Sequence, residues 1–176
     1  MRNILLATAA ISLFAMPAMA QTISTPQWSG SAGYTVLDGD DVTLGAITGR
    51  LAARVHPNFA VEGEASIGVK DDDITVAGVN GSVEQDYDAA IYAVGIVPVS
   101  PNFELFGRVG YGTTSIKADV AGVSAEADGE SVNYGAGATY YLDAQNGLRA
   151  DWTRRDFTDD NGGDLDTYGV SYVRRF

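Results

Sequence analysis

The dominant pattern along the chain is an alternation of apolar or small residues with polar ones. Over residues 28–37 the even positions are apolar or small, while the odd positions include Ser29, Ser31 and Thr35. The same period of two recurs at residues 45–55, 59–69, 87–99, 103–111, 132–142, 148–153 and 167–175. Since successive side chains of a strand point to opposite faces, the pattern predicts eight β-strands, each with an apolar and a polar face.

Residues 87–99 are the segment in which the two faces separate least clearly. Asp86 and Asp88 both lie at even positions, so the odd positions are favoured as the apolar face. That face holds Ala89, Ile91, Ala93 and Val97. The opposite assignment, with Tyr92, Val94 and Ile96 as the apolar face, fits nearly as well and stays open.

The connections between the strands alternate in character. Three are tight and rich in Pro, Asn and Gly, at residues 56–58, 100–102 and 143–147. Four are longer or more acidic, at residues 38–42, 71–85, 118–130 and 156–166. The motif PNFAVEG at residues 57–63 returns as PNFELFG at residues 101–107, one pair of strands later. Tight and long connections at opposite ends predict an up-and-down barrel.

The length of the chain suits a barrel that spans a membrane. A spanning strand needs about 9 to 11 residues, so eight strands and their connections fit comfortably after position 20. A barrel of ten strands would need two further strands. Residues 74–79 and 83–87 could supply them only by pairing above the membrane, so we treat these residues as an extension of one hairpin. Pairing of the first strand with the last leaves no edge unpaired in lipid.

The alternation alone does not say which face is buried. A soluble lipocalin-like barrel turns its apolar face inward, and an outer-membrane barrel turns it outward. Charged residues recur at mid-strand on the polar face, which favours the membrane barrel. Aromatic residues also gather near both ends of the strands, as two interfacial girdles would. The turn-side group is Trp28, Phe59, Phe103, Tyr140 and Phe176, and the loop-side group is Tyr34, Tyr111, Tyr134 and Tyr168.

The N-terminus has the pattern of a secretory signal. Arg2 precedes an apolar run over residues 4–16, and Ala18-Met19-Ala20 is a small-x-small cleavage site. Cleavage after Ala20 leaves one domain, residues 21–176. An anchor helix is the alternative, but the run is short and Pro17 interrupts it. The absence of a cysteine after the apolar run rules out a lipoprotein.

Composition narrows the partners. With 23 acidic and 11 basic residues the formal net charge is -12, which argues against a nucleic-acid partner. The chain has no cysteine, so it holds no disulfide and no Cys-ligated metal. Most acids fall in the four long connections, as a rim that divalent cations could bridge to lipopolysaccharide phosphates; a simple solvated charge run is the favoured explanation. Residues 38–41 lack the spacing of a calcium loop.

The signal segment, the Pro-Asn-Phe turns and the end GVSYVRRF at residues 169–176 resemble the outer-membrane β-barrel family, with its small OmpA- and OmpX-type members. The resemblance implies a monomer in a Gram-negative outer membrane, in contact with membrane lipid and lipopolysaccharide. It also implies that the barrel assembly machinery recognises a final aromatic residue and apolar residues before it, here Tyr168, Val170, Tyr172 and Phe176. Arg174 departs from that alternation.

The inward-facing charges form the candidate site. Besides the arginines of the network given below, Lys70, Arg155 and Arg175 are predicted to face inward. The numbers of inward bases and inward acids are nearly equal. An eight-stranded lumen is only wide enough for side chains, and an unpaired charge away from water costs several kcal/mol. We therefore predict a charge network that fills the lumen: Arg50, Arg54, Glu62, Glu64, Glu104, Arg108, Arg149 and Asp151. A narrow porin-like channel is the alternative, and a soluble periplasmic lipocalin-like binder is a third.

Catalysis is not expected. The one histidine, His56, lies in a tight turn on the side opposite the long loops, and acyl transfer generally needs a positioned base. Glu62 and Glu64 share their face with Arg50 and Arg54, so ion pairing explains them better than acid–base chemistry. The sequence predicts no cofactor and no metal, and a structural or surface-interaction role.

Overall fold

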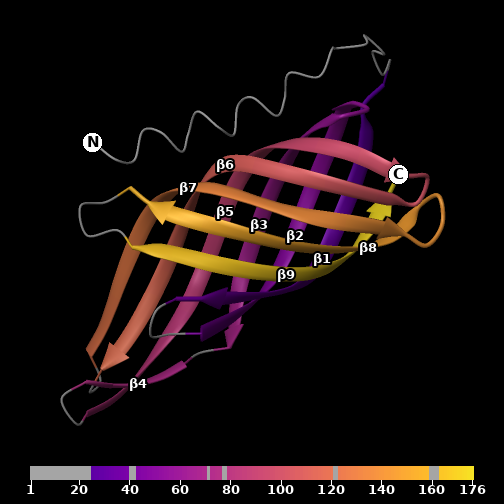
Figure 1. Ribbon diagram of the computed structural model, residues 1–176. Helices are drawn as coiled ribbons and strands as arrows, with labels where there is room; N and C mark the ends of the chain where they lie inside the picture. Colours follow the sequence, from indigo (N-terminus) through magenta and orange to yellow (C-terminus); the bar gives the residue numbers. More distant parts are fainter. Residues whose placement is uncertain (1–24, 40–42, 71, 77–78, 121–122, 159–162) are drawn as a thin grey trace.

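The computed structural model of the chain describes residues 25–39, 43–70, 72–76, 79–120, 123–158 and 163–176, without the side chains of residues 70–86 and 116–128. The predicted signal peptide, residues 1–20, lies outside the described residues. Within the described segments, no helix is long and apolar enough to cross a bilayer. The strands are β1 (Gln27–Asp38), β2 (Thr43–His56), β3 (Phe59–Lys70), β4 (Asp72–Val76), β5 (Val79–Ser100), β6 (Phe103–Val120), β7 (Val123–Tyr141), β8 (Asn146–Phe157) and β9 (Asp164–Arg175) (Figure 1).

The strands form a closed antiparallel barrel in which neighbours along the chain are neighbours in space. The order is β3-β2-β1-β9-β8-β7-β6-β5, and pairing of β3 with β5 closes the ring. Strand β4 continues β3 along the same partner: Ser66 pairs with Asp88 of β5, and Asp72 pairs with Val83. The described segments therefore build eight barrel strands, which confirms the prediction.

The repeated Pro-Asn turns have a common structural basis. The amide nitrogen of Asn58 donates to the carbonyl of Ile96 at 2.9 Å, and that of Asn102 donates to the carbonyl of Tyr141 at 3.1 Å. The backbone N–H of each of these two partners donates back to the asparagine carbonyl, at 2.9 and 2.7 Å. Each asparagine thus joins its own turn to the next strand of the barrel, which explains the recurrence of the motif.

The third tight turn, residues 142–145, is held by an aspartate instead. Oδ1 of Asp143 accepts hydrogen bonds from the backbone N–H groups of Gln145 and Asn146, both at 2.8 Å. The side-chain amide of Asn146 donates to Oδ2, also at 2.8 Å. These donors, that side-chain amide first, hold the pKa of Asp143 below its usual value.

Two of the predicted long connections are largely strand. The prediction of a long connection at residues 118–130 is wrong, because β6 continues to Val120, which pairs with Val123 at the start of β7. The apolar–polar alternation in fact persists there, and acidic residues on the polar parity had suggested a loop. At residues 71–85, β4 pairs with β5, as the hairpin extension predicted. Strands β4 to β7 consequently project together at the lower left of Figure 1.

The outer wall is apolar and the lumen is polar. Large apolar side chains such as Val170 and Ile67 point outward, 65% and 58% exposed, while Arg108 is 4% exposed. This arrangement excludes the soluble lipocalin-like alternative, which needs the apolar face inside. Eight of the nine predicted girdle aromatics are among the exposed side chains, and Phe103 is half-buried.

The ambiguous strand follows the assignment that its aspartates favoured. Ile91 and Val97 are 61% and 50% exposed on the outer wall. Tyr92 and Val94 are inside, at 1% and 4%, and form an apolar cluster with Ala60 and Phe106. The lumen therefore contains an apolar layer beside its charges, and that layer was not predicted.

Candidate functional site: the charged lumen

The period of two places most of the predicted network at one level of the barrel. Arg50 lies on β2, Glu62 and Glu64 on β3, Arg108 on β6, and Arg149 and Asp151 on β8. Residues two apart on a strand share a face, so the pairs on β3 and β8 both point inward. Each of the six residues is less than 9% exposed. The barrel thus brings six side chains from four strands into one buried group.

Arg108 is the centre of this group. Its Nη1 lies 2.8 Å from Oε2 of Glu64 and 3.1 Å from Oε1 of Glu62. Its Nη2 lies 3.0 Å from Oδ2 of Asp151, and its Nε donates to Oγ1 of Thr153 at 2.8 Å. One guanidinium thereby links β6 to β3 and β8, neither of which is its neighbour in the barrel wall.

Two further arginines bind the same acids. Arg50 contacts Glu64 at 2.6 Å and Asp151 at 3.2 Å. Arg149 contacts Glu62 at 2.5 Å and Asp151 at 3.1 Å. Each of these three carboxylates therefore touches at least two guanidinium groups, and charge-assisted bonds of this kind are the strong ones.

Asp88 and Arg155 complete the group. Arg155 pairs with Asp88 and lies 3.3 Å from Glu64, and both residues are 2% exposed. Arg155 was predicted to face inward. Asp88 was placed on the polar parity of residues 87–99 but was not named in the predicted network, and that parity directs it into the lumen. Four arginines, Arg50, Arg108, Arg149 and Arg155, then face four acids, Glu62, Glu64, Asp88 and Asp151. The central group is neutral.

The remaining two predicted residues lie in a separate group near the tight turns. Arg54 contacts Oε1 of Glu104 at 2.8 Å, and Arg175 contacts the same oxygen at 3.1 Å. These side chains are 13 to 18% exposed, and the Arg175 guanidinium stacks 3.4 Å over the Tyr141 ring. The eight predicted residues thus form two groups, because the strands place Arg54 and Glu104 closer to the turn end.

Aromatic and amide groups pack around the central charges. Arg108 lies 4.4 Å over the Tyr92 ring, and Arg149 lies 4.1 Å over the Phe106 ring. The Tyr92 hydroxyl donates to Glu64 at 3.3 Å and accepts from the amide of Asn133 at 3.2 Å. Tyr92, Phe106 and Asn133 were not predicted as site residues. Only Tyr92 had been named before, in the alternative assignment of residues 87–99.

A small cavity separates the two charged groups. Its volume is about 60 Å³, and Arg54, Glu104, Glu62 and Arg149 are among the residues that line it. A space of this size between charged groups is large enough to hold water.

At the loop end, acids of the last connection bind an arginine. Arg154 lies 3.1 Å from Asp166 and 3.8 Å from Asp156, and it also pairs with Asp164. The side chains of the predicted rim at residues 71–86 and 119–128 lie outside the described residues. Among the side chains that are described, no group of three or more His, Asp or Glu is placed to hold a metal ion.

The residues proposed as an assembly signal share the outer face of β9. Val170 and Tyr168 are 65% and 51% exposed, Tyr172 is 45% exposed, and Phe176 is 73% exposed. The backbone N–H of Phe176 donates to the carbonyl of Trp28 at 2.9 Å, which fixes the chain end against β1. Arg174 points outward as well.

Comparison with known families assigns the chain. The pattern of the outer membrane protein beta-barrel domain matches residues 6–176. The chain belongs to this family. Membership places the apolar outer wall in an outer membrane, which agrees with the inside-out distribution of charge. No protein in a search of curated sequences matches the chain.

Solved structures of the same fold include three bacterial proteins. The attachment invasion locus protein Ail of Yersinia pestis, solved with a heparin analogue, superposes with a TM-score of 0.62 at 18% identity, covering 86% of this chain and 99% of Ail. OprG of Pseudomonas aeruginosa gives 0.63 at 10% identity, with 86% and 96% covered. Neisserial surface protein A gives 0.54 at 12% identity, with 85% and 95% covered. At these identities the likeness concerns the fold.

Proposed function

We propose that the chain is a monomeric outer-membrane barrel with a lumen filled by side chains, acting in envelope structure and surface interaction and not in conduction or catalysis. The observation that carries the proposal is the position of Arg108, bound at once to Glu62, Glu64 and Asp151. A permeating ion would have to separate these buried groups.

A buried ion pair contributes little net stability when it is intact, but the barrel loses much stability when one partner is removed. Removing one partner of a buried ion pair leaves an uncompensated charge and destabilises by about 3 to 5 kcal/mol. Arg108 has three such partners, each within 3.1 Å. An eight-stranded barrel has room for side chains but little more, so no alternative place for the displaced groups exists inside the wall.

The proposed surface role rests on charge. The segments at the loop end, residues 38–42, 71–85, 118–130 and 156–166, carry most of the acids. That end faces outward in barrels of this family, so it presents an anionic rim beside lipopolysaccharide phosphates. Divalent cations bridge carboxylates to phosphates. We propose export through the signal segment, residues 1–20, and insertion by the barrel assembly machinery through Tyr168, Val170, Tyr172 and Phe176.

Planar bilayer recording tests the filled lumen. Purified wild-type protein is expected to give no discrete conductance steps, and Arg108→Ala is expected to give steps or brief openings because it removes the centre of the group. Arg154→Ala, which alters a partly exposed arginine at the loop end, is the matched control and should remain silent. Regular steps from the wild type would overturn the proposal in favour of the narrow porin-like channel.

A second test addresses the rim. If divalent cations join the rim to lipopolysaccharide, the barrel in vesicles that contain lipopolysaccharide should unfold at a higher temperature with Mg²⁺ than with a chelator. An equal midpoint in both conditions would identify the rim as a solvated charge run only. Migration that changes on heating in detergent gels reports the folded barrel in each sample.

A further inference from the structure

The charges at the turn end of the lumen do not cancel. Arg54 and Arg175 both bind Oε1 of Glu104, at 2.8 and 3.1 Å. The central group beside them contains as many arginines as acids and is neutral, so it supplies no compensating charge. Two guanidinium groups share one carboxylate, so the turn-end group of Arg54, Glu104 and Arg175 has a net charge of +1.

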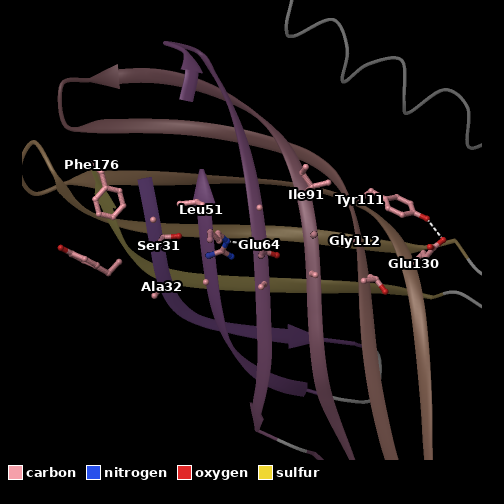
Figure 2. A pocket seen from close by; sticks show the side chains of 18 residues that line it. Ser31, Ala32, Leu51, Glu64, Ile91, Tyr111, Gly112, Glu130 and Phe176 are labelled. Atoms are coloured by element: carbon pink, nitrogen blue, oxygen red, sulfur yellow. Dashed lines mark hydrogen bonds and ion pairs between the residues drawn. The ribbon is translucent and has the colours of Figure 1, made fainter. Parts of the chain in front are cut away.

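Two other carboxylates lie near this end of the barrel, and neither pairs with the group. Asp143 is exposed in the third tight turn and accepts hydrogen bonds from its own turn. The chain ends one residue after Arg175, on the outer wall, where the ring of Phe176 lines a groove together with Leu51 (Figure 2). Within the described part of the chain, no base lies within 4 Å of the terminal carboxylate. The excess charge therefore has no ionic partner among the described residues.

The cavity of about 60 Å³ between the two charged groups lies beside this excess charge. Its lining includes three arginines and two hydroxyl groups, from Arg54, Arg149, Arg175, Ser29 and Thr139. Guanidinium groups only donate hydrogen bonds, and hydroxyl groups can donate as well. The carboxylates on the wall, Glu62 and Glu104, each already bind two arginines. The cavity thus presents donors and positive charge to anything inside it.

Arg175 is the arginine best placed to hold a ligand there. Arg54 is engaged on two sides, since its Nε donates to the carbonyl of Pro57 and its Nη1 donates to Glu104. Arg175 donates to Glu104 from Nη2, and its guanidinium stacks 3.4 Å over the Tyr141 ring. A guanidinium carries five N–H donors in one plane, so stacking on its face leaves donors along its edge.

We propose that this cavity binds one small monovalent anion of about the size of chloride, held mainly by Arg175. An uncompensated charge away from bulk water is costly, and one such anion neutralises the group. The cavity is large enough for a water molecule or an ion of similar size. The side chains of the group are 13 to 18% exposed, so the ion enters from the turn end. It does not pass Arg108, and the inference is therefore independent of the filled lumen.

Thermal unfolding in a zwitterionic detergent tests the site, with chloride replacing gluconate at constant ionic strength so that screening does not change. An ion that binds the folded barrel raises the unfolding midpoint as its concentration rises, which we expect of the wild type. Arg175→Gln leaves Arg54 and Glu104 as a neutral pair and should abolish the response to chloride. Arg174→Gln is the matched control, because it removes the same charge from the adjacent, outward-facing position of β9 and should keep the response.

Glu104→Gln should act in the opposite direction. It leaves both arginines without their carboxylate, so chloride is expected to bind about fivefold more tightly or better. Unchanged or weaker binding by this variant would overturn the electrostatic basis of the site. Gels with and without heating confirm that each variant is folded before the comparison.

Three further results would overturn the site: no chloride response in the wild type, an equal response in Arg175→Gln, or loss of the response in Arg174→Gln as well. Bromide in crystals of the wild-type protein locates the ion through its anomalous scattering. A bromide peak is expected in the cavity beside Arg175, and peaks confined to the outer surface would contradict the assignment. Conductance plays no part in these measurements, so they fail or succeed separately from the proposed function.

Discussion

Nη1 of Arg108 lies 2.8 Å from Oε2 of Glu64, although the two residues belong to strands that do not pair. Strand β5 lies between β3 and β6 in the wall, so the contact crosses the lumen. Both side chains are 1% exposed. A pair removed from water in this way contributes little net stability when intact but is costly to break.

Arg108→Ala is expected to destabilise the barrel by about 3 to 5 kcal/mol, because it strands Glu62, Glu64 and Asp151 without their shared partner. The measurement is reversible urea unfolding in lipid vesicles. Arg154→Ala, at an arginine with a 32% exposed side chain, should lose no more than about 1 kcal/mol. Equal unfolding midpoints for wild type and Arg108→Ala would contradict the central role of this arginine.

Asp88→Asn is expected to destabilise less than Glu64→Gln. Glu64 contacts Arg50, Arg108 and Arg155, whereas among the described side chains Asp88 pairs with Arg155. After the change at Asp88, Arg155 keeps Glu64 and the hydroxyl of Thr114. Unfolding midpoints of the two variants under one condition decide the order, and the reverse order would show that Asp88 is the stronger anchor.

The barrel itself could be predicted because its periodicity is local. Ala32, Tyr34 and Val36 alternate with polar residues whatever the strand pairs with, and the turn residues Asn58 and Asn102 mark the reversals. Charges on the inner parity then indicated a membrane barrel. These signals depend only on the sequence near each residue, so they can be recognised without knowing which strands pair.

The composition of the lumen groups could not be predicted in the same way. Parity shows that Arg54 and Arg108 both face inward, but their depth depends on the stagger between strands, which sets which residues meet across the lumen. The same stagger brings Asp88 to Arg155 and separates Glu104 from the central acids.

Gly135→Ala is expected to destabilise the barrel by about 1 to 3 kcal/mol through crowding. A Cβ at this position would lie 2.2 Å from the carbonyl oxygen of Trp152 and 2.6 Å from Oγ1 of Thr153, the residue that Arg108 binds. Gly63→Ala is the matched control, since its Cβ would meet open space on the outer wall. Comparable midpoints for the two alanine variants would mean that β7 and β8 can separate without loss.

Phe176→Ala is expected to lower the amount of barrel assembled in cells while leaving folding in detergent nearly unchanged. The ring is 73% exposed on the outer wall, so its removal deletes little packing, and the backbone bond to Trp28 remains. The heat-modifiable band in outer-membrane fractions measures assembly, and refolding of purified protein into micelles measures intrinsic folding.

Phe59→Ala supplies the control for that experiment, because Phe59 is another outward aromatic at the turn end, 40% exposed, and lies outside the last strand. If the final aromatic is recognised as a signal, only Phe176→Ala reduces assembly in cells. If both variants reduce it equally, the loss reflects the aromatic girdle and its place at the membrane interface. A parallel loss of refolding in micelles would instead assign Phe176 a structural role at the junction of β1 and β9.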